Sequence, residues 1–406
     1  MREFGPVRFI LGEDPEAAKP YIGIARMQLG ITKNLMNLGG LRQGSRIVTL
    51  ADGTVIRSQS VFGQDTVTIS PVIVEAPQAI DLPSIVEPVR GTRKVLVDVP
   101  FSDVQSTYPS SAFWTAVAWN GTVFVAVCGN NGGGSGNSTK AMRSVDGITW
   151  AVSTLPTSQN WRGVAWNGTV FCAIGTVSGG TYDYATSPDG ITWTPRAFPN
   201  YSNWTAIAWN GSVFCVLGGG YTATSPDGIT WAMHDAATAP DYFSNGDIAS
   251  TGDGVLCTIP SDELDFSYVS TNNGATWAQY LLPSTAFWYS IAWNGTVFCV
   301  LQPGTTNAAT SPDGVTWTPR TLPVSGGWSD IAWNGTVFCA TDGTTAITSP
   351  DGITWETHAL VNPISNGSSG MASNGSDFCV LGGGFPGGLH GVVIIPEHTI
   401  EIEVPA

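Results

Sequence analysis

The stretch Trp204–Trp231, WTAIAWNGSVFCVLGGGYTATSPDGITW, decides the fold because it contains two hairpin signals in a row. Residues 205–209 read as a strand, Asn210-Gly211 is a strong signal for a two-residue turn, and residues 213–216 read as the return strand. The second turn falls at Pro226-Asp227-Gly228, where proline presets φ and glycine accepts a left-handed backbone. Two hairpins supply four strands, so this stretch predicts a four-stranded antiparallel unit.

The same pattern recurs along the chain at intervals of 40 to 47 residues. Aligned on one aliphatic position of the first strand, the copies fall at Val117, Val164, Ile207, Ile248, Ile291, Ile331 and Met371. A period of about 42 residues with four strands per repeat is typical of a β-propeller blade. We therefore predict an all-β protein with a seven-bladed β-propeller of four-stranded blades over residues 111–406.

The closing strands of the last repeat depart from this pattern. Residues 391–396 and 399–405 are expected to supply the last two strands of the seventh blade. A strand borrowed from residues 94–99 (KVLVDV) is an open alternative.

The 16 tryptophans fall into three positions of the repeat. Five begin the first strand, namely Trp114, Trp161, Trp204, Trp288 and Trp328. Five end that strand and six follow the second turn, and these eleven are expected to pack between blades. Six of the seven cysteines also share one position, which predicts small buried apolar residues rather than disulfides, metal ligands or a catalytic thiol.

The segment Ser187–Trp193 (SPDGITW) resembles the Asp box of sialidase-like propellers, S-x-D-x-G-x-T-W, although most copies here are one residue shorter. The residues at the Asp position are Asp146, Asp189, Asp227, Asn272, Asp313 and Asp351. The resemblance covers about 295 residues and implies the fold. It implies a turn-capping role for the Asp side chain, with calcium binding as a minor alternative. The seventh repeat has no Asp box.

The resemblance does not carry over to sialidase activity. Sialidases use an arginine cluster, a Tyr–Glu nucleophile pair and an acid Asp, and this propeller has no assignable counterpart. The four histidines lack metal-ligand spacing, and no Ser/His/Asp arrangement or phosphate-binding loop is found in a credible context. We expect no enzyme activity, no cofactor and no metal.

A ligand site is expected on the face of the propeller where loops vary between repeats. The five tryptophans that open the first strands begin near that face, where exposed rings would stack on sugars, although filling gaps between blades is the stronger interpretation. Tyr184, Tyr221 and Asp265 are further candidates. The irregular fourth repeat, with Ser250-Thr251-Gly252 in place of Trp-Asn-Gly, fits either a divergent binding edge or sequence drift.

The first hundred residues differ in character from the rest. Residues 21–37 read as an amphipathic helix, residues 51–53 as a hairpin turn, and residues 66–74 as a strand. We expect a small α+β docking module over residues 1–75 and a linker or extended arm over residues 76–110. This region carries a net charge of +1, whereas residues 101–406 carry −16, which disfavours nucleic acid as a partner of the second part.

This organisation is similar in overall style to tailed-bacteriophage virion proteins. It implies a non-enzymatic virion component, present in multiple copies, whose residues 1–100 bind other virion proteins while the propeller reads a host surface glycan. Alternatives are a purely architectural propeller and a glycan-cleaving enzyme using carboxylates such as Asp183 and Asp265. The sequence shows no signal peptide and no membrane-spanning run, so we expect synthesis in the host cytoplasm and release by lysis.

Overall fold

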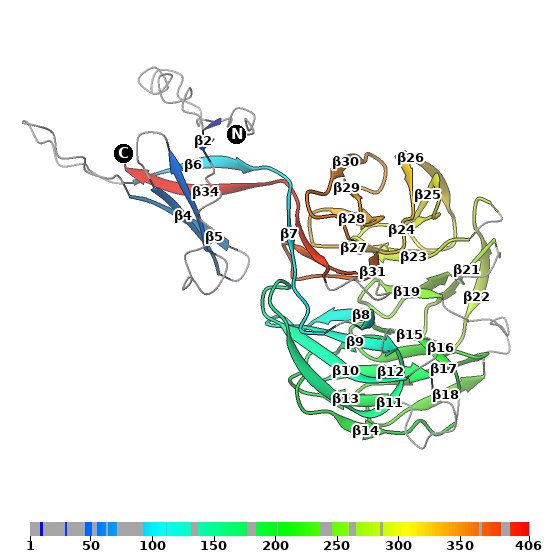
Figure 1. The fold of residues 1–406 in the computed structure, drawn as a ribbon. Helices are drawn as coiled ribbons and strands as arrows, with labels where there is room; N and C mark the ends of the chain where they lie inside the picture. The colour runs from blue at the N-terminus through cyan, green and yellow to red at the C-terminus, as the bar shows by residue number, and fades with distance from the viewer. Residues whose placement is uncertain are drawn as a thin grey trace, which may run out of the picture. The chain divides into compact units, whose positions relative to one another are not determined.

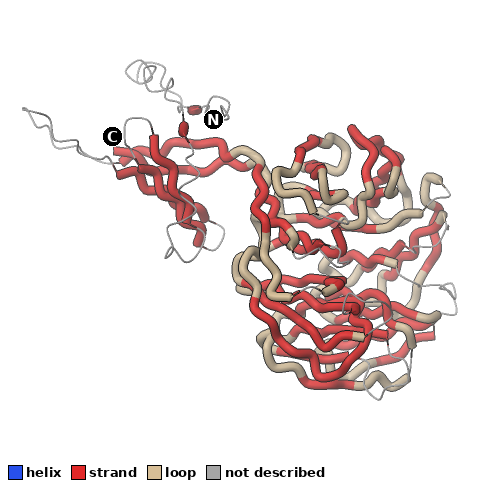
Figure 2. Tube along the Cα trace, in the orientation of Figure 1, coloured by secondary structure: helices blue, strands red, loops and turns tan. Residues whose placement is uncertain are grey.

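The computed structural model describes residues 92–405 except 111, 131–136, 177–183, 201, 236–245, 260–264, 285–286, 365–367 and 383–389, together with five strands before residue 92. Every helix or strand element among these residues is a strand (Figures 1 and 2). The chain divides into two compact units, one formed by Met1–Phe101 with Glu397–Ala406 and the other by Ser102–Pro396.

The first unit contains a seven-stranded sheet with the strand order β1-β6-β34-β5-β4-β3-β2. Its strands are β1 (Phe9–Ile10), β2 (Leu29–Gly30), β3 (Ser45–Leu50), β4 (Val55–Val61), β5 (Gln64–Ser70), β6 (Thr92–Val99) and β34 (His398–Pro405). β3 and β4 pair as an antiparallel hairpin around the predicted turn. The α+β expectation is not supported, because the described part of the expected helix is β2 and the remainder of residues 21–37 lies outside the described residues.

The second unit contains one seven-stranded sheet and five four-stranded sheets. The seven-stranded sheet consists of β8 (Phe113–Trp119), β9 (Phe124–Asn130), β10 (Ser138–Ser144), β11 (Ala151–Trp166), β12 (Phe171–Thr176), β13 (Tyr184–Ser187) and β14 (Thr194–Arg196). The long strand β11 pairs with β10 through residues 151–159 and with β12 through residues 160–166. This sheet is therefore two four-stranded units that share β11, which we call blades 1 and 2.

The other five sheets follow in chain order as blades 3 to 7. Blade 3 contains β15 (Trp204–Trp209), β16 (Phe214–Gly218), β17 (Tyr221–Ser225) and β18 (Ala232–Asp235). Blade 4 contains β19 (Asp247–Ser250), β20 (Leu256–Ile259), β21 (Phe266–Ser270) and β22 (Ala278–Leu281). Blade 5 contains β23 (Ser290–Trp293), β24 (Phe298–Leu301), β25 (Thr305–Ser311) and β26 (Thr318–Gly326).

Blade 6 contains β27 (Ile331–Trp333), β28 (Phe338–Thr341), β29 (Thr345–Ser349) and β30 (Glu356–Ala359). Blade 7 contains β31 (Ser368–Ser373), β32 (Phe378–Gly382), β33 (Val392–Ile395) and β7 (Ser102–Gln105). The first strands contact one another in succession, β8 with β11, then β15, β19, β23, β27 and β31, and β31 contacts β8 again. The blades therefore form a closed ring around their first strands, which run through the middle of the unit in Figure 1.

The ring closes differently from the sequence expectation. β33 is the third strand of blade 7 as expected, but the fourth is β7, which precedes blade 1 in the chain. The strand expected over residues 399–405 lies in β34 and pairs with β6 in the first unit, so residues 94–99 do not complete blade 7 either. The Asp103 carboxylate explains the position of β7, because it accepts hydrogen bonds from the backbone N–H groups of Val361 and Asn362, each at 2.8 Å.

The hydrophobic core lies between adjacent blades. One cluster joins Cys172 and Ile174 of blade 2 to Trp204, Phe214 and Val216 of blade 3, and comparable clusters occupy other junctions. All seven cysteines are buried and free, and burial was predicted for the six that share one position of the repeat. Burial raises the pKa of the thiols of Cys172, Cys215, Cys257, Cys299, Cys339 and Cys379, which keeps them protonated and unreactive.

Candidate functional site

The Asp-box turns are closed by their own side chains. In blades 1, 2, 3, 5 and 6 the carboxylate accepts two backbone N–H groups of the turn at 2.8–3.0 Å. The serine two residues earlier donates its hydroxyl to the same carboxylate and accepts the glycine N–H of the turn. The residues concerned are Asp146, Asp189, Asp227, Asp313 and Asp351. Each aspartate thus accepts hydrogen bonds within its own turn.

These contacts make one stability prediction. For Asp227, the N–H of Thr230 and then that of Ile229 hold the pKa below its usual range against partial desolvation. We expect Asp227→Ala to lower the free energy of unfolding by about 1 kcal/mol, because the carboxylate is exposed and a charged hydrogen bond is weakened there. Urea unfolding at pH 7 measures this.

The pH dependence gives the control. Since the folded pKa is lowered, the contribution is present above the unfolded pKa near 3.8 and is lost as the pH falls below it. Asp227→Ala and the unaltered protein should therefore converge in stability at pH values near 2–3. A constant difference down to that pH would show that the carboxylate charge does not stabilise the turn.

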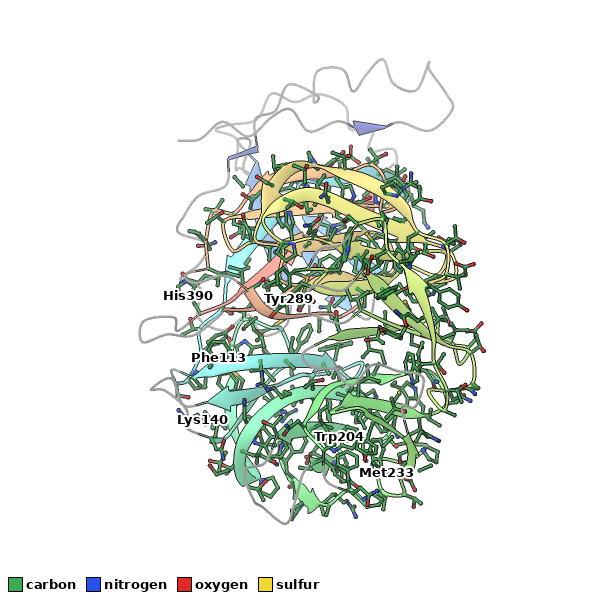
Figure 3. All side chains as sticks on the ribbon, turned by 90° about the vertical axis from the view of Figure 1, so that its right-hand side faces the viewer. Phe113, Lys140, Trp204, Met233, Tyr289 and His390 are labelled. Carbon is green, nitrogen blue, oxygen red and sulfur yellow. The ribbon has the colours of Figure 1, made fainter. Side chains whose placement is uncertain are left out.

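The five tryptophans that open first strands are not available to a ligand. Trp114, Trp161, Trp204, Trp288 and Trp328 are each 0 or 1% exposed. Trp204, labelled in Figure 3, packs at 4.7 Å between ring centroids against Phe198 and belongs to the cluster between blades 2 and 3. A sugar ring cannot stack on a side chain with no exposed face, so the glycan interpretation of this set is wrong and the gap-filling interpretation holds.

The remaining candidates are not brought together. Tyr184 is 1% exposed and packs against Phe198 and Trp231, so it is also excluded as a ligand contact. Tyr221 is 37% exposed on β17 in blade 3. Asp265 lies next to β21 in blade 4 and is partly exposed. Asp183 and much of the variable loops lie outside the described residues, so a site on that face stays a prediction.

A pocket of about 560 Å³ lies between blades 4 and 5. Its volume is within the usual range of small-molecule sites, about 300–1,000 Å³. Thr251 and Asp253 come from the first turn of blade 4, and Gly295 and Asp313 come from the first and second turns of blade 5. The pocket is therefore at the end of the blades that carries the Asn-Gly and Asp-box turns, which we call the turn face, and not on the variable face.

Two one-residue insertions in blade 4 form one wall of the pocket. In its first turn Thr251 N–H bonds to the carbonyl of Val255, four residues on, whereas the corresponding bond in blade 1 spans three residues. In its second turn Asn272 Oδ1 accepts the N–H of Thr276, again four residues on. Asn273 takes up the extra length with a left-handed backbone, φ 61°. Residues of both lengthened turns line the pocket.

The lining combines aromatic rings with oxygen groups. The rings belong to Trp277, Tyr280 and Trp293, and the oxygen groups to the exposed carboxylates of Asp253 and Asp313 and to threonine hydroxyls. Among the described residues that line it, none is Lys, Arg or His. Aromatic faces hold apolar ligand surfaces, and carboxylates accept hydrogen bonds from hydroxyl or amino groups. The chemistry fits a neutral or cationic polyhydroxylated ligand and disfavours an anion.

Both carboxylates stay ionised at neutral pH. The hydroxyl of Thr251, which donates to Asp253, holds the pKa of that carboxyl below its usual range. For Asp313, partial desolvation is the largest influence and would raise the pKa, but the N–H groups of Thr316 and Val315 and the hydroxyl of Ser311 together lower it. Neither group is set to donate a proton.

The irregularity of blade 4 is visible in the sequence, but the pocket is not. The available signal was that both turns of the repeat are one residue longer than their counterparts. Among the described residues, no group of three or more His, Cys, Asp or Glu side chains is placed to hold a metal ion. No helix in the same part of the chain is long and apolar enough to cross a membrane.

Comparisons with known structures show the fold. Virginiamycin B lyase from Staphylococcus aureus aligns with 73% of this chain and 99% of its own, with a TM-score of 0.60 and 9% identity. YCF48 bound to a D1 peptide aligns with 73% of this chain and 97% of its own, with a TM-score of 0.56 and 15% identity. YCF48 from Cyanidioschyzon merolae gives a TM-score of 0.53, with 15% identity over 72% of this chain and 98% of that one.

These structures and the four-stranded sheets establish a β-propeller. No protein-family model and no curated protein matches the sequence. At 9 to 15% identity the likeness concerns the fold and says nothing about a shared activity.

Proposed function

We propose that this protein is a non-enzymatic virion component whose seven-bladed β-propeller recognises a surface glycan of the host through the pocket between blades 4 and 5. The observation that carries the proposal is the combination of Trp293, Tyr280, Asp253 and Asp313 around one pocket. Sugar rings have apolar C–H faces that stack on aromatic side chains and hydroxyl edges that donate to carboxylates. The pocket offers both kinds of contact.

Binding without cleavage follows from the protonation of the pocket. Most glycoside hydrolases pair a carboxylate with a carboxylic acid whose pKa is raised, so that it can protonate the leaving group. Here the pKa values of Asp253 and Asp313 are both lowered, and neither carboxyl group retains a proton at neutral pH. The pocket can hold a saccharide but lacks the general acid that would cleave it.

The division of the chain supports an anchor separate from the binding unit. Residues 1–101 join residues 397–406 in a compact unit of their own, in which β34 pairs with β6 along eight residues. We propose that this unit attaches the protein to other virion proteins, and that the propeller is displayed in several copies. The charge difference between the two parts agrees with different partners.

The test measures binding of the full chain to purified surface polysaccharide of candidate bacterial hosts and to host cells with and without that polysaccharide. Trp293→Ala should weaken binding on the order of tenfold, because the loss of a stacked ring costs about 0.5–1.5 kcal/mol beyond the buried area. Asp253→Asn should weaken it as well by removing a charged acceptor.

Trp166→Ala is the matched control, since Trp166 occupies the same position in blade 2 and packs on Phe171 at 4.6 Å as Trp293 packs on Phe298 at 4.5 Å. It should leave binding unchanged. Equal binding by Trp293→Ala, Asp253→Asn and Trp166→Ala would remove the pocket from the proposal.

A purely architectural role is the second candidate. One similar propeller, YCF48, is found bound to a peptide, so this fold serves as a protein-binding surface in that case. A folded full chain that binds no host polysaccharide, but still binds virus particles lacking it, would favour this role.

A further inference from the structure

At one position of the first strands, polar residues occur in three consecutive blades only. The residue before the aligned aliphatic position is Ala116, Gly163, Ala206, Asp247, Ser290, Asp330 and Gly370 in blades 1 to 7. Four of these positions hold alanine or glycine. The three polar residues fall in consecutive blades, 4, 5 and 6, and the structure brings them into contact.

Ser290 is hydrogen-bonded to both carboxyl groups. Its Oγ lies 2.9 Å from Asp247 Oδ2 and 3.1 Å from Asp330 Oδ1. The same Oγ accepts the backbone N–H of Ile331 at 3.0 Å. Asp247 is also held by the backbone, because Oδ1 accepts the N–H of Ile248 at 2.8 Å and Oδ2 that of Ile291 at 3.0 Å. The network thus ties blades 4, 5 and 6 together.

One further proton would let every contact of this network be a hydrogen bond. A serine hydroxyl has a single hydrogen to donate and two lone pairs to accept with. It cannot donate to two carboxylates at once, yet it lies within hydrogen-bond distance of both. Backbone N–H groups donate to both carboxyls, but they are a leading influence only at Asp247, where Ile291 and Ile248 donate, and they come last among the influences on Asp330, so we place the negative charge on Asp247. A proton on Asp330 Oδ1 would donate to Ser290 Oγ, whose own hydrogen would go to Asp247 Oδ2.

The surroundings of Asp330 agree with this assignment. Desolvation by the surrounding protein, and then the neighbouring charge of Asp247, raise the pKa of Asp330 to about 8. Desolvation also raises the pKa of Asp247, which three hydrogen bonds to Ile291, Ser290 and Ile248 oppose. Both residues are partly buried, and neither is fully enclosed by the protein.

We propose that Asp330 carries a proton that it shares through Ser290 with Asp247, and that this shared proton is a pH-sensitive clasp holding blades 4 to 6 together. Loss of the proton leaves two carboxylates competing for one hydroxyl hydrogen. Their repulsion then acts across both blade junctions, 4 to 5 and 5 to 6. The ring is therefore tighter at neutral and acidic pH than at alkaline pH.

Few other groups near the clasp titrate. The strands β19, β23, β27 and β31 hold no further titratable side chain besides Asp247, and no basic one. Tyr289 precedes Ser290 and is 46% exposed. The adjacent second strands contribute the buried thiols of Cys257, Cys299, Cys339 and Cys379, whose raised pKa values keep them neutral in this range.

The sign of the pH effect follows from linkage. The folded state holds the proton on Asp330 up to about pH 8, whereas an unfolded Asp releases it near pH 4. Between these values the folded state binds more protons, so the stability falls as the pH rises and becomes constant above the folded pKa.

The test compares the full chain with Asp330→Asn by thermal unfolding at pH 6 to 9. The melting temperature of the unaltered protein should fall by about 5 °C or more over this range, because a loss of stability of this size typically lowers the melting temperature by several degrees. In Asp330→Asn the neutral amide donates to Ser290 without titrating, so this fall should be largely absent. Asp265→Asn, a partly exposed carboxyl in blade 4, should keep it. An equal fall in Asp330→Asn would overturn the proposal.

A second measurement keeps the proposal testable if Asp330→Asn does not fold. The infrared spectrum of the unaltered protein should show a protonated carboxyl band at pH 6 that disappears by pH 9. If no such band is present at pH 6, Asp330 holds no proton and the clasp does not exist.

Discussion

A chain of residues 106–396 is expected to unfold at least about 10 °C below a chain of residues 102–396, because only the longer one contains β7. Without β7 the third strand of blade 7, Val392–Ile395, becomes an unpaired edge of four apolar residues that are buried in the closed ring. The Asp103 carboxylate is lost too, with its bonds to Val361 and Asn362. Charged hydrogen bonds contribute about 1.5–3 kcal/mol each, and 1 kcal/mol shifts the melting temperature by roughly 2–4 °C in a domain of this kind.

Calorimetry and light scattering of the two chains check this expectation. Both chains lack β6 and β34, so their difference isolates β7. The shorter chain should also aggregate, since an exposed hydrophobic edge strand pairs with other chains. Equal melting temperatures without aggregation would mean that β7 does not close the ring.

Replacing Trp204 by Ala is expected to lower the free energy of unfolding by about 3–5 kcal/mol, the usual cost of removing a fully buried large aromatic side chain. Trp204 has no exposed surface and packs against Phe198 in the core between blades 2 and 3. Trp209→Ala should cost less, because Trp209 is only partly buried at the edge of the same cluster. Urea unfolding of both variants measures the difference.

Trp204→Ala also distinguishes a role of Trp204 in the core from a role in ligand binding. At a temperature where Trp204→Ala remains folded, it should bind host polysaccharide as well as the unaltered protein does. If Trp204→Ala had near-normal stability and lost binding, Trp204 would be a ligand contact after all.

The repeat made most of the propeller predictable. Asn-Gly and Pro-Asp-Gly turns recur beside short strands, and each such hairpin is specified locally. The burial of six of the seven cysteines followed from their shared position in the repeat. Because each hairpin is specified locally, the strands within one blade could be predicted without knowing which distant residues they contact.

Ring closure and the pocket were harder to predict for physical reasons. The pairing of β7 with β33 joins residues almost 300 positions apart, and the sequence pointed to residues 399–405 or 94–99 for this place rather than to 102–105. The tryptophans at the start of first strands have equal stacking potential whether buried or exposed, and only the contacts between blades decide the matter. The pocket depends on two single-residue insertions that sequence alone does not distinguish from drift.

The central claim is that the turn face between blades 4 and 5 binds glycan. Hydrogen–deuterium exchange of the full chain, with and without purified host polysaccharide, tests it most directly. We predict slower exchange in the segments 251–255 and 313–315, which contain residues that line the pocket. Protection confined to the variable-face loops, with no change at these two segments, would contradict the claim.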